Sequence, residues 1–140
     1  MTYKFLPDVA LADIAFEAHS KTVNGLFESC ANALADIMVD PKSLHAKVTK
    51  KITLKSDDLD RLLYDFLTEL IVIKDVDSLL FSDVKVEVGS EGTKLSAEAK
   101  GEPIDRVRHI LRNDVKAVTM HMFGIQQEGT KWKATVVLDI

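Results

Sequence analysis

The sequence predicts an α+β fold in which two amphipathic helices pack on a largely antiparallel or mixed β-sheet. Two segments carry apolar residues at the three- and four-residue spacing of a helix, and several others alternate apolar and polar residues as strands do. The strand-like segments dominate the second half of the chain, where turn residues join them as hairpins. No linker separates two cores, so we expect residues 1–140 to form a single compact domain.

The first strand and the first helix are expected near the N-terminus. Residues 12–18 alternate as a strand, with Asp13 on the polar face. Residues 23–38 then carry an apolar helical stripe that includes Cys30, and Ser20 is the expected N-cap. Because free cysteine is usually a small core residue, we expect Cys30 to be buried.

A second strand and a second helix follow. Residues 46–54 return to period two, and Lys50 interrupts their apolar face, which favours an edge strand. Residues 59–70 carry the strongest helical stripe of the chain, and Ser56 is the expected cap.

The second half of the chain predicts a run of strands. Residues 84–88 and 95–99 form a hairpin across a glycine-containing turn. Residues 118–122 alternate as a further strand, with His121 on its polar side, and residues 132–138 form the last strand.

The composition is that of a globular protein without membrane segments. Hydrophobic residues make up 46% and charged residues 29% of the chain, which is ordinary for such proteins. The longest apolar stretches are far shorter than the roughly 20 residues that span a bilayer, and the N-terminus lacks the pattern of a secretion signal. The single cysteine cannot form an internal disulfide, which fits a reducing compartment. We therefore expect a cytoplasmic protein.

The net charge of −4 argues against direct binding of nucleic acid, because such proteins usually present a basic patch to the phosphates. The basic clusters of the chain are Lys47–Lys50–Lys51–Lys55 and Arg106–Arg108–Arg112. The first lies on a strand-like segment, where a solvated face is the simpler interpretation. Any link to RNA is therefore expected to run through a protein partner.

Catalytic signatures are absent from the sequence. It contains neither a glycine-rich phosphate loop nor a GxSxG nucleophile elbow. The histidines are too scattered for a zinc motif; they are His19, His45, His109 and His121.

Two aspartates are candidate ligands for a cation. Asp13 is flanked by apolar residues, where an unpaired charge is costly, and Asp139 precedes Ile140 at the end of a hydrophobic strand. The α-carboxylate of Ile140 then lies within a few ångströms of Asp139. Carboxylates brought together repel unless a cation lies among them, and such oxygen ligands favour calcium or magnesium. The alternative, that each aspartate faces solvent, is the commoner arrangement for this residue and stays open here.

Several segments of the chain resemble the archease family. They are residues 11–15 (LADIA), 35–39 (ADIMV), 62–71 (LLYDFLTELI), 115–121 (VKAVTMH) and 137–140 (VLDI). The segments occur in the family's order and spacing, and the resemblance covers essentially the whole length.

The resemblance implies an accessory protein and not an enzyme. Archeases activate the RtcB-type ligase that joins tRNA halves, by promoting its guanylylation and repeated turnover. The family's metal site corresponds to Asp13, Asp139 and Ile140 here, with calcium as the expected ion and magnesium as the alternative. Lys116 and His121 match other motif positions, and we expect them to serve activation or partner contact.

One position departs from the family pattern. Many members have histidine where this chain has Ala10, which removes any ligand or hydrogen-bonding role of that side chain. Two other functions remain as alternatives to the activator. One is a small metal-dependent hydrolase that uses Asp13 and Asp139 to activate a water, and the other is a chaperone-like binding module.

Overall fold

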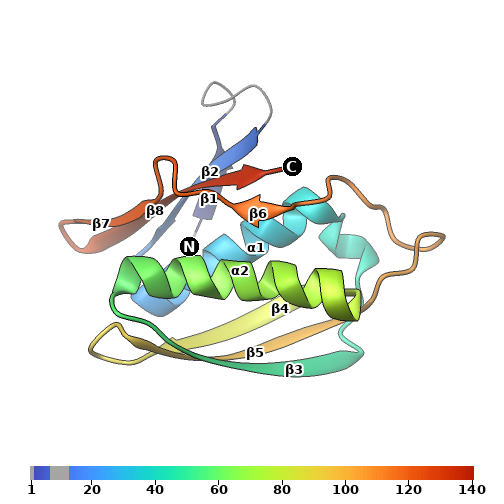
Figure 1. The fold of residues 1–140 in the computed structure, drawn as a ribbon, viewed down its shortest axis with the longest axis horizontal. Helices are drawn as coiled ribbons and strands as arrows, with labels where there is room; N and C mark the ends of the chain where they lie inside the picture. The colour runs from blue at the N-terminus through green and yellow to red at the C-terminus, as the bar shows by residue number, and fades with distance from the viewer. Residues whose placement is uncertain (1, 7–12) are drawn as a thin grey trace.

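The strands divide between two antiparallel sheets, and both helices lie between the sheets (Figure 1). The computed structural model describes residues 2–6 and 13–140. The elements of this part of the chain are β1 (Thr2–Phe5), β2 (Asp13–Ser20), α1 (Val23–Met38), a 3₁₀ turn (Pro41–Ser43), β3 (Val48–Lys55), α2 (Leu59–Asp77), β4 (Leu79–Val88), β5 (Lys94–Pro103), β6 (Ala117–Val118), β7 (Gly124–Glu128) and β8 (Lys131–Asp139).

The predicted fold class is confirmed: two helices pack with antiparallel sheets in an α+β arrangement. The structure adds that the sheets are two. One has the order β1–β2–β8–β6, with β7 also paired to β8, and the other has the order β3–β5–β4. β3 pairs only with β5 among the described strands, so the predicted edge strand is confirmed.

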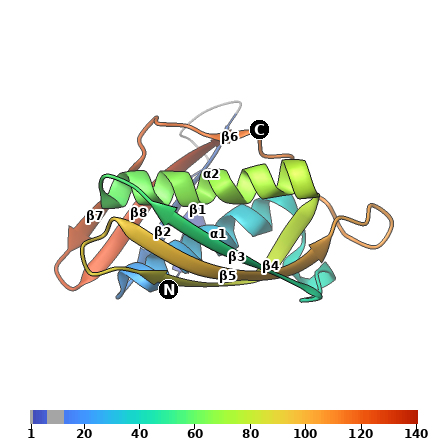
Figure 2. The ribbon, with the colours of Figure 1, turned by 60° about the horizontal axis from the view of Figure 1, so that its bottom comes forward.

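Helix α1 packs against both sheets. It contacts β4 of the smaller sheet and β2 and β8 of the larger one, and Figure 2 shows it enclosed between the two layers. Its buried residues include the consecutive positions 25–27 and 29–31, so they cover more than a single narrow stripe. Cys30 is among them at 0% exposure, as predicted, and burial raises the pKa of its thiol.

Both helices begin with a cap two residues later than the sequence suggested. Thr22 accepts the N–H three residues on at 3.0 Å, and Asp58 does the same at 2.8 Å. The predicted caps, Ser20 and Ser56, are therefore wrong. An N-cap side chain accepts a hydrogen bond from an N–H two or three residues further along the chain. Where two polar residues precede a helix, the sequence alone does not show which of them lies at that spacing.

The predicted strand over residues 118–122 is also wrong beyond Val118. The last ladder-like bond runs from the Thr119 N–H to the carbonyl of Val137 at 2.9 Å. Residues 120–123 then form a turn, in which the Phe123 N–H donates to the carbonyl of Met120 at 3.3 Å. His121 therefore lies in this turn and not on a strand face.

Neither helix of the described residues has the length and apolar character needed to cross a membrane.

Candidate functional site

The two predicted aspartates lie directly opposite each other. β2 and β8 pair antiparallel, with Asp13 opposite Asp139. Directly opposed side chains point to the same face of a sheet, with Cβ atoms about 4.5–5.5 Å apart. Both residues are half-buried. The register of one strand pair thus joins residues from opposite ends of the chain.

A third segment meets Asp139 from the other side. β6 places Ala117 opposite Asp139, and the N–H of Lys116 donates to the Asp139 carbonyl at 2.8 Å. This contact fixes the main chain of Lys116, while its side chain is exposed. The main chain of the predicted lysine therefore lies beside Asp139.

The next row of the same face holds an unpaired hydroxyl. Ala15 lies opposite Val137, and the N–H of Thr119 donates to the carbonyl of that valine. The Thr119 hydroxyl is buried and has no hydrogen-bond partner among the residues that the structure describes. Buried polar groups usually have a partner, and an ordered water is the usual partner of a hydroxyl that lacks one in the protein.

The donors at this edge fit a hard cation only if the chain terminus takes part. Within residues 2–6 and 13–140, no group of three or more histidine, cysteine, aspartate or glutamate side chains is arranged to hold a metal ion. Asp13 and Asp139 supply two carboxylates, and a third oxygen donor would be the α-carboxylate of Ile140. The side chain of Ile140 packs against the core, which holds that residue in place. An all-oxygen set of this kind suits calcium or magnesium.

His121 is placed differently from the other predicted residues. It is exposed in the turn after Thr119, away from the ladder that joins the aspartates. Tyr64 of α2 holds this region: its hydroxyl donates to the Val118 carbonyl at 3.2 Å, and its ring meets Phe123 edge-on at 5.6 Å between centroids. The sequence placed Tyr64 on a helix but gave no signal for this contact, which depends on where the helix lies against the sheet.

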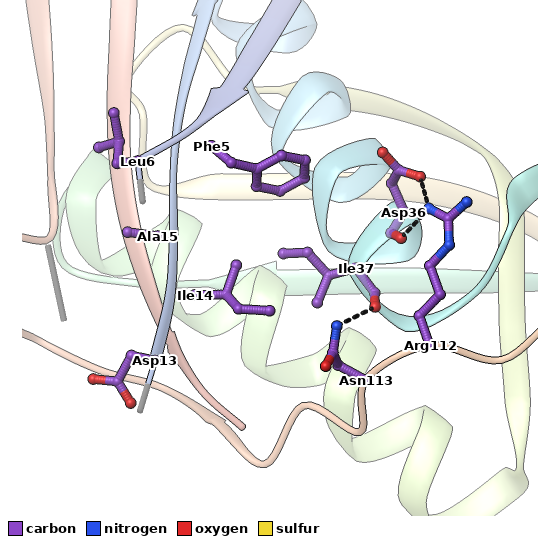
Figure 3. Close-up of a pocket in the computed structure, with 9 residues that line it drawn as sticks. All are labelled: Phe5, Leu6, Asp13, Ile14, Ala15, Asp36, Ile37, Arg112 and Asn113. Atoms are coloured by element: carbon purple, nitrogen blue, oxygen red, sulfur yellow. Dashed lines mark hydrogen bonds and ion pairs between the residues drawn. The ribbon is translucent and has the colours of Figure 1, made fainter. Parts of the chain in front are cut away.

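A pocket of about 370 Å³ opens on the core-facing side of the same strand (Figure 3). It lies between the first strands, the end of α1 and the segment at Arg112. Figure 3 shows Ile14 pointing toward Ile37 in this pocket, whereas the carboxylate of Asp13 points away on the other side of β2. Asp13 is nevertheless one of the lining residues, so the pocket extends to the end of β2 that carries the aspartate pair. Ala10, where the chain departs from the family pattern, lies outside the described residues.

The fold and the aspartate pair define a small α+β protein with two opposed carboxylates at the ends of two paired strands. A family model described as the archease protein family (MTH1598/TM1083) matches residues 3–140, so this chain belongs to the archease family. Archeases are accessory activators of RtcB-type RNA ligases, and the chain is accordingly not a catalyst in its own right.

Curated relatives and solved structures agree with this assignment. The archease of Pyrococcus abyssi is 37% identical over 132 residues, which cover 92% of this chain and 93% of the relative. The archease of Methanosarcina barkeri is 35% identical over 141 residues, covering 99% and 95%. The solution structure of protein 1598 from Methanobacterium thermoautotrophicum is 34% identical, with a TM-score of 0.81 and coverage of 99% and 98%.

A more distant structure supports the fold alone. It is a Thermotoga maritima protein described as an archease and possible chaperone, which is 18% identical with a TM-score of 0.67 over 96% of each chain.

Proposed function

We propose that this archease activates an RtcB-type tRNA-splicing ligase in the cytoplasm by promoting its guanylylation and repeated turnover. The observation that supports this most directly is the meeting of three separated segments at one edge: Asp13, Asp139 and Lys116 are joined by a single strand register. These are the positions that the family resemblance connects with metal binding and activation.

The proposed cation, calcium before magnesium, is held by the side chains of Asp13 and Asp139 and the α-carboxylate of Ile140. Like charges directly opposite each other destabilise a sheet, and a bound cation supplies the positive charge that offsets this repulsion. All three of these residues are half-buried, at the end of a strand or directly after it. Flexible oxygen-rich sites generally suit calcium better than magnesium, which demands octahedral geometry.

Lys116 and His121 are proposed as contacts to the ligase. Both side chains are exposed, and their main chains are held by the edge of β8 and by the turn that follows Thr119. An exposed lysine ammonium can reach a partner carboxylate or phosphate as a point charge. RNA is then recognised by the ligase, in keeping with the net charge of −4.

The test is guanylylation and multiple-turnover ligation by a purified RtcB-type ligase, with and without this protein. The protein alone should show no ligase, nucleotidyltransferase or phosphatase activity, and it should raise the number of ligation cycles when the ligase is present. The matched variants are Asp13→Asn, expected to lose activation, and Asp83→Asn on β4, expected to keep it. The proposal fails if the wild-type protein changes neither guanylylation nor turnover of the ligase. It also fails if the purified protein hydrolyses GTP by itself and Asp13→Asn hydrolyses it equally well.

A further inference from the structure

The last turn of α2 carries a buried lysine whose contacts lead toward the candidate site. The Lys74 side chain is only 8% exposed, although lysine is rarely buried without partners. Its ammonium donates to Asp114 Oδ1 at 2.6 Å and to the Val115 carbonyl at 2.7 Å, and it pairs with Asp75 Oδ1 at 2.6 Å. An ammonium group has three donors, so each has a partner.

The main-chain contact is the buried one. Burial lowers the pKa of Lys74, but the hydrogen bonds to Asp114 and Asp75 outweigh it and raise the net pKa, so the lysine is charged at neutral pH. The carboxylates are 78% and 54% exposed, and exposed ion pairs contribute little. Val115 is 0% exposed. Without the lysine, its carbonyl would lack a partner in a buried place, which is costly.

A second side chain of the same helix holds the same segment. Tyr64 donates to the Val118 carbonyl at 3.2 Å, while Lys74 donates to the Val115 carbonyl. The two contacts lie on either side of Lys116, whose N–H donates to the Asp139 carbonyl at 2.8 Å. Helix α2 therefore fixes both ends of the short stretch that lies against Asp139.

We propose that Lys74 is a positioning residue for the candidate site: with Tyr64 it holds residues 115–118 against Asp139 and so fixes the main chain of Lys116 next to that residue. The effect on the ligase rests on the proposed function, whereas the effect on the main chain of Lys116 does not. The competing explanation is that Lys74 only completes the C-terminal end of α2, where a cation is favourable to the helix dipole.

Amide hydrogen exchange followed by NMR separates these explanations. Lys74→Met removes the ammonium but keeps a long unbranched side chain, and the two carboxylates left behind are exposed and stay solvated. We expect protection of the Lys116 and Thr119 amides to fall by about tenfold, the size of effect that follows from losing a buried hydrogen bond to a charged group. Protection of the Leu26 amide in α1 should not change.

Two further variants make the experiment decisive. Asp75→Asn removes the partner of Lys74 that lies on α2 itself, so it should keep wild-type protection at Lys116. Tyr64→Phe removes the other contact of the helix to this segment but keeps the aromatic ring, and it should also lower protection at Lys116. This variant tests whether α2 holds residues 115–118 even if Lys74→Met does not fold.

Ligase assays add a readout that depends on position. In guanylylation assays, Lys74→Met should reduce the maximal rate by about tenfold, on the same estimate, and change the half-maximal concentration of archease much less. The proposal is overturned if Lys74→Met and Tyr64→Phe keep wild-type protection at Lys116, or if protection is lost only within α2. If the wild-type protein fails to activate the ligase, the proposed function is wrong, and the exchange result still decides the role of Lys74.

Discussion

Asp13 and Asp139 occupy directly opposed positions on two paired strands, where like charges normally cost free energy. Hydrophobic or oppositely charged pairs would stabilise this edge better. Keeping two carboxylates there is understandable if the site serves to bind a cation, with stability coming from the surrounding core. Substitutions of single residues at this edge, and their effects on stability and activation, therefore distinguish a binding role from a structural one.

Asp139→Asn tests the repulsion directly. Without added metal, the variant should unfold with the same free energy as the wild type or with a gain of about 0.2–1 kcal/mol, because one of two opposed charges is removed. Added calcium should raise the melting temperature of the wild type by binding the folded state, and it should not raise that of the variant. Thermal unfolding with and without calcium measures both, with Asp83→Asn as the control. Equal stabilisation of Asp139→Asn by calcium would contradict the proposed ligand set.

Lys116→Ala tests the exposed lysine beside Asp139. Lys116 contacts Asp139 through its main chain, which the substitution keeps. The variant should therefore change the free energy of unfolding by no more than about 0.5 kcal/mol, as surface substitutions usually do. Activation of the ligase should fall by most of its value. Lys131→Ala, which removes an exposed lysine at the other end of β8, should activate normally. A fully active Lys116→Ala would show that this side chain is an ordinary surface residue.

The segment between β5 and β6 is anchored by a buried carboxylate. Glu102 is 1% exposed, and it accepts hydrogen bonds from Arg108, from the His109 ring at 2.7 Å and from the His45 N–H at 2.9 Å. The His109 Nδ1 accepts the Asp105 N–H at 2.8 Å, so the ring proton lies on Nε2 and is donated to Glu102. This network ties the first part of the segment to β5 of the smaller sheet. The later part of the segment, at Asp114 and Val115, contacts Lys74.

Glu102→Gln should therefore flatten the acid dependence of stability. The Arg108 hydrogen bond, opposed by burial and aided by the bonds from His109 and His45, holds the pKa of Glu102 well below its usual value of 4.5. A depressed carboxyl pKa contributes stability that is complete above the unfolded pKa and is lost as the pH falls below it.

The variant should be less stable than the wild type at pH 7, and its free energy of unfolding should change less between about pH 5 and pH 2. Urea titrations across that range measure this, with Glu98→Gln on the same strand as the exposed control. Parallel pH profiles of wild type and Glu102→Gln would contradict the role of this network.

At the scale of the whole molecule, the candidate site lies where the larger sheet brings distant segments together. Figure 1 shows the end of β8 beside the beginning of β2, with β6 on its other side. Helix α2 lies against β6 as well as against the smaller sheet, so it connects this edge with the rest of the core. A change at the terminal residue is therefore expected to act on the site while leaving the core intact.

Appending a few residues after Ile140 tests this expectation. The extension converts the proposed α-carboxylate ligand into a neutral peptide carbonyl, which loses a full negative charge at the cation. Calcium affinity by calorimetry and ligase guanylylation should fall together, whereas an extension before Met1 should leave both unchanged. Strand ends usually tolerate additions, so an unaffected C-terminal extension would remove Ile140 from the ligand set.

Much of this protein follows from local patterns in its sequence. Apolar spacing determined both helices, the hairpin of β4 and β5 and the last strand, because periodicity reports which faces are buried. The family could also be recognised from short segments, and Asp13 and Asp139 were predicted as candidate ligands from the same segments.

Only the tertiary structure decided how these parts meet. It divided the strands between two sheets, set Asp13 opposite Asp139, ended β6 at Val118 and brought Lys74 to the Val115 carbonyl. The physical reason is that register, caps and buried polar contacts depend on partners far away in the chain. A local pattern specifies that a face is apolar, but it carries no information about which distant residue will cover that face or accept a given hydrogen bond.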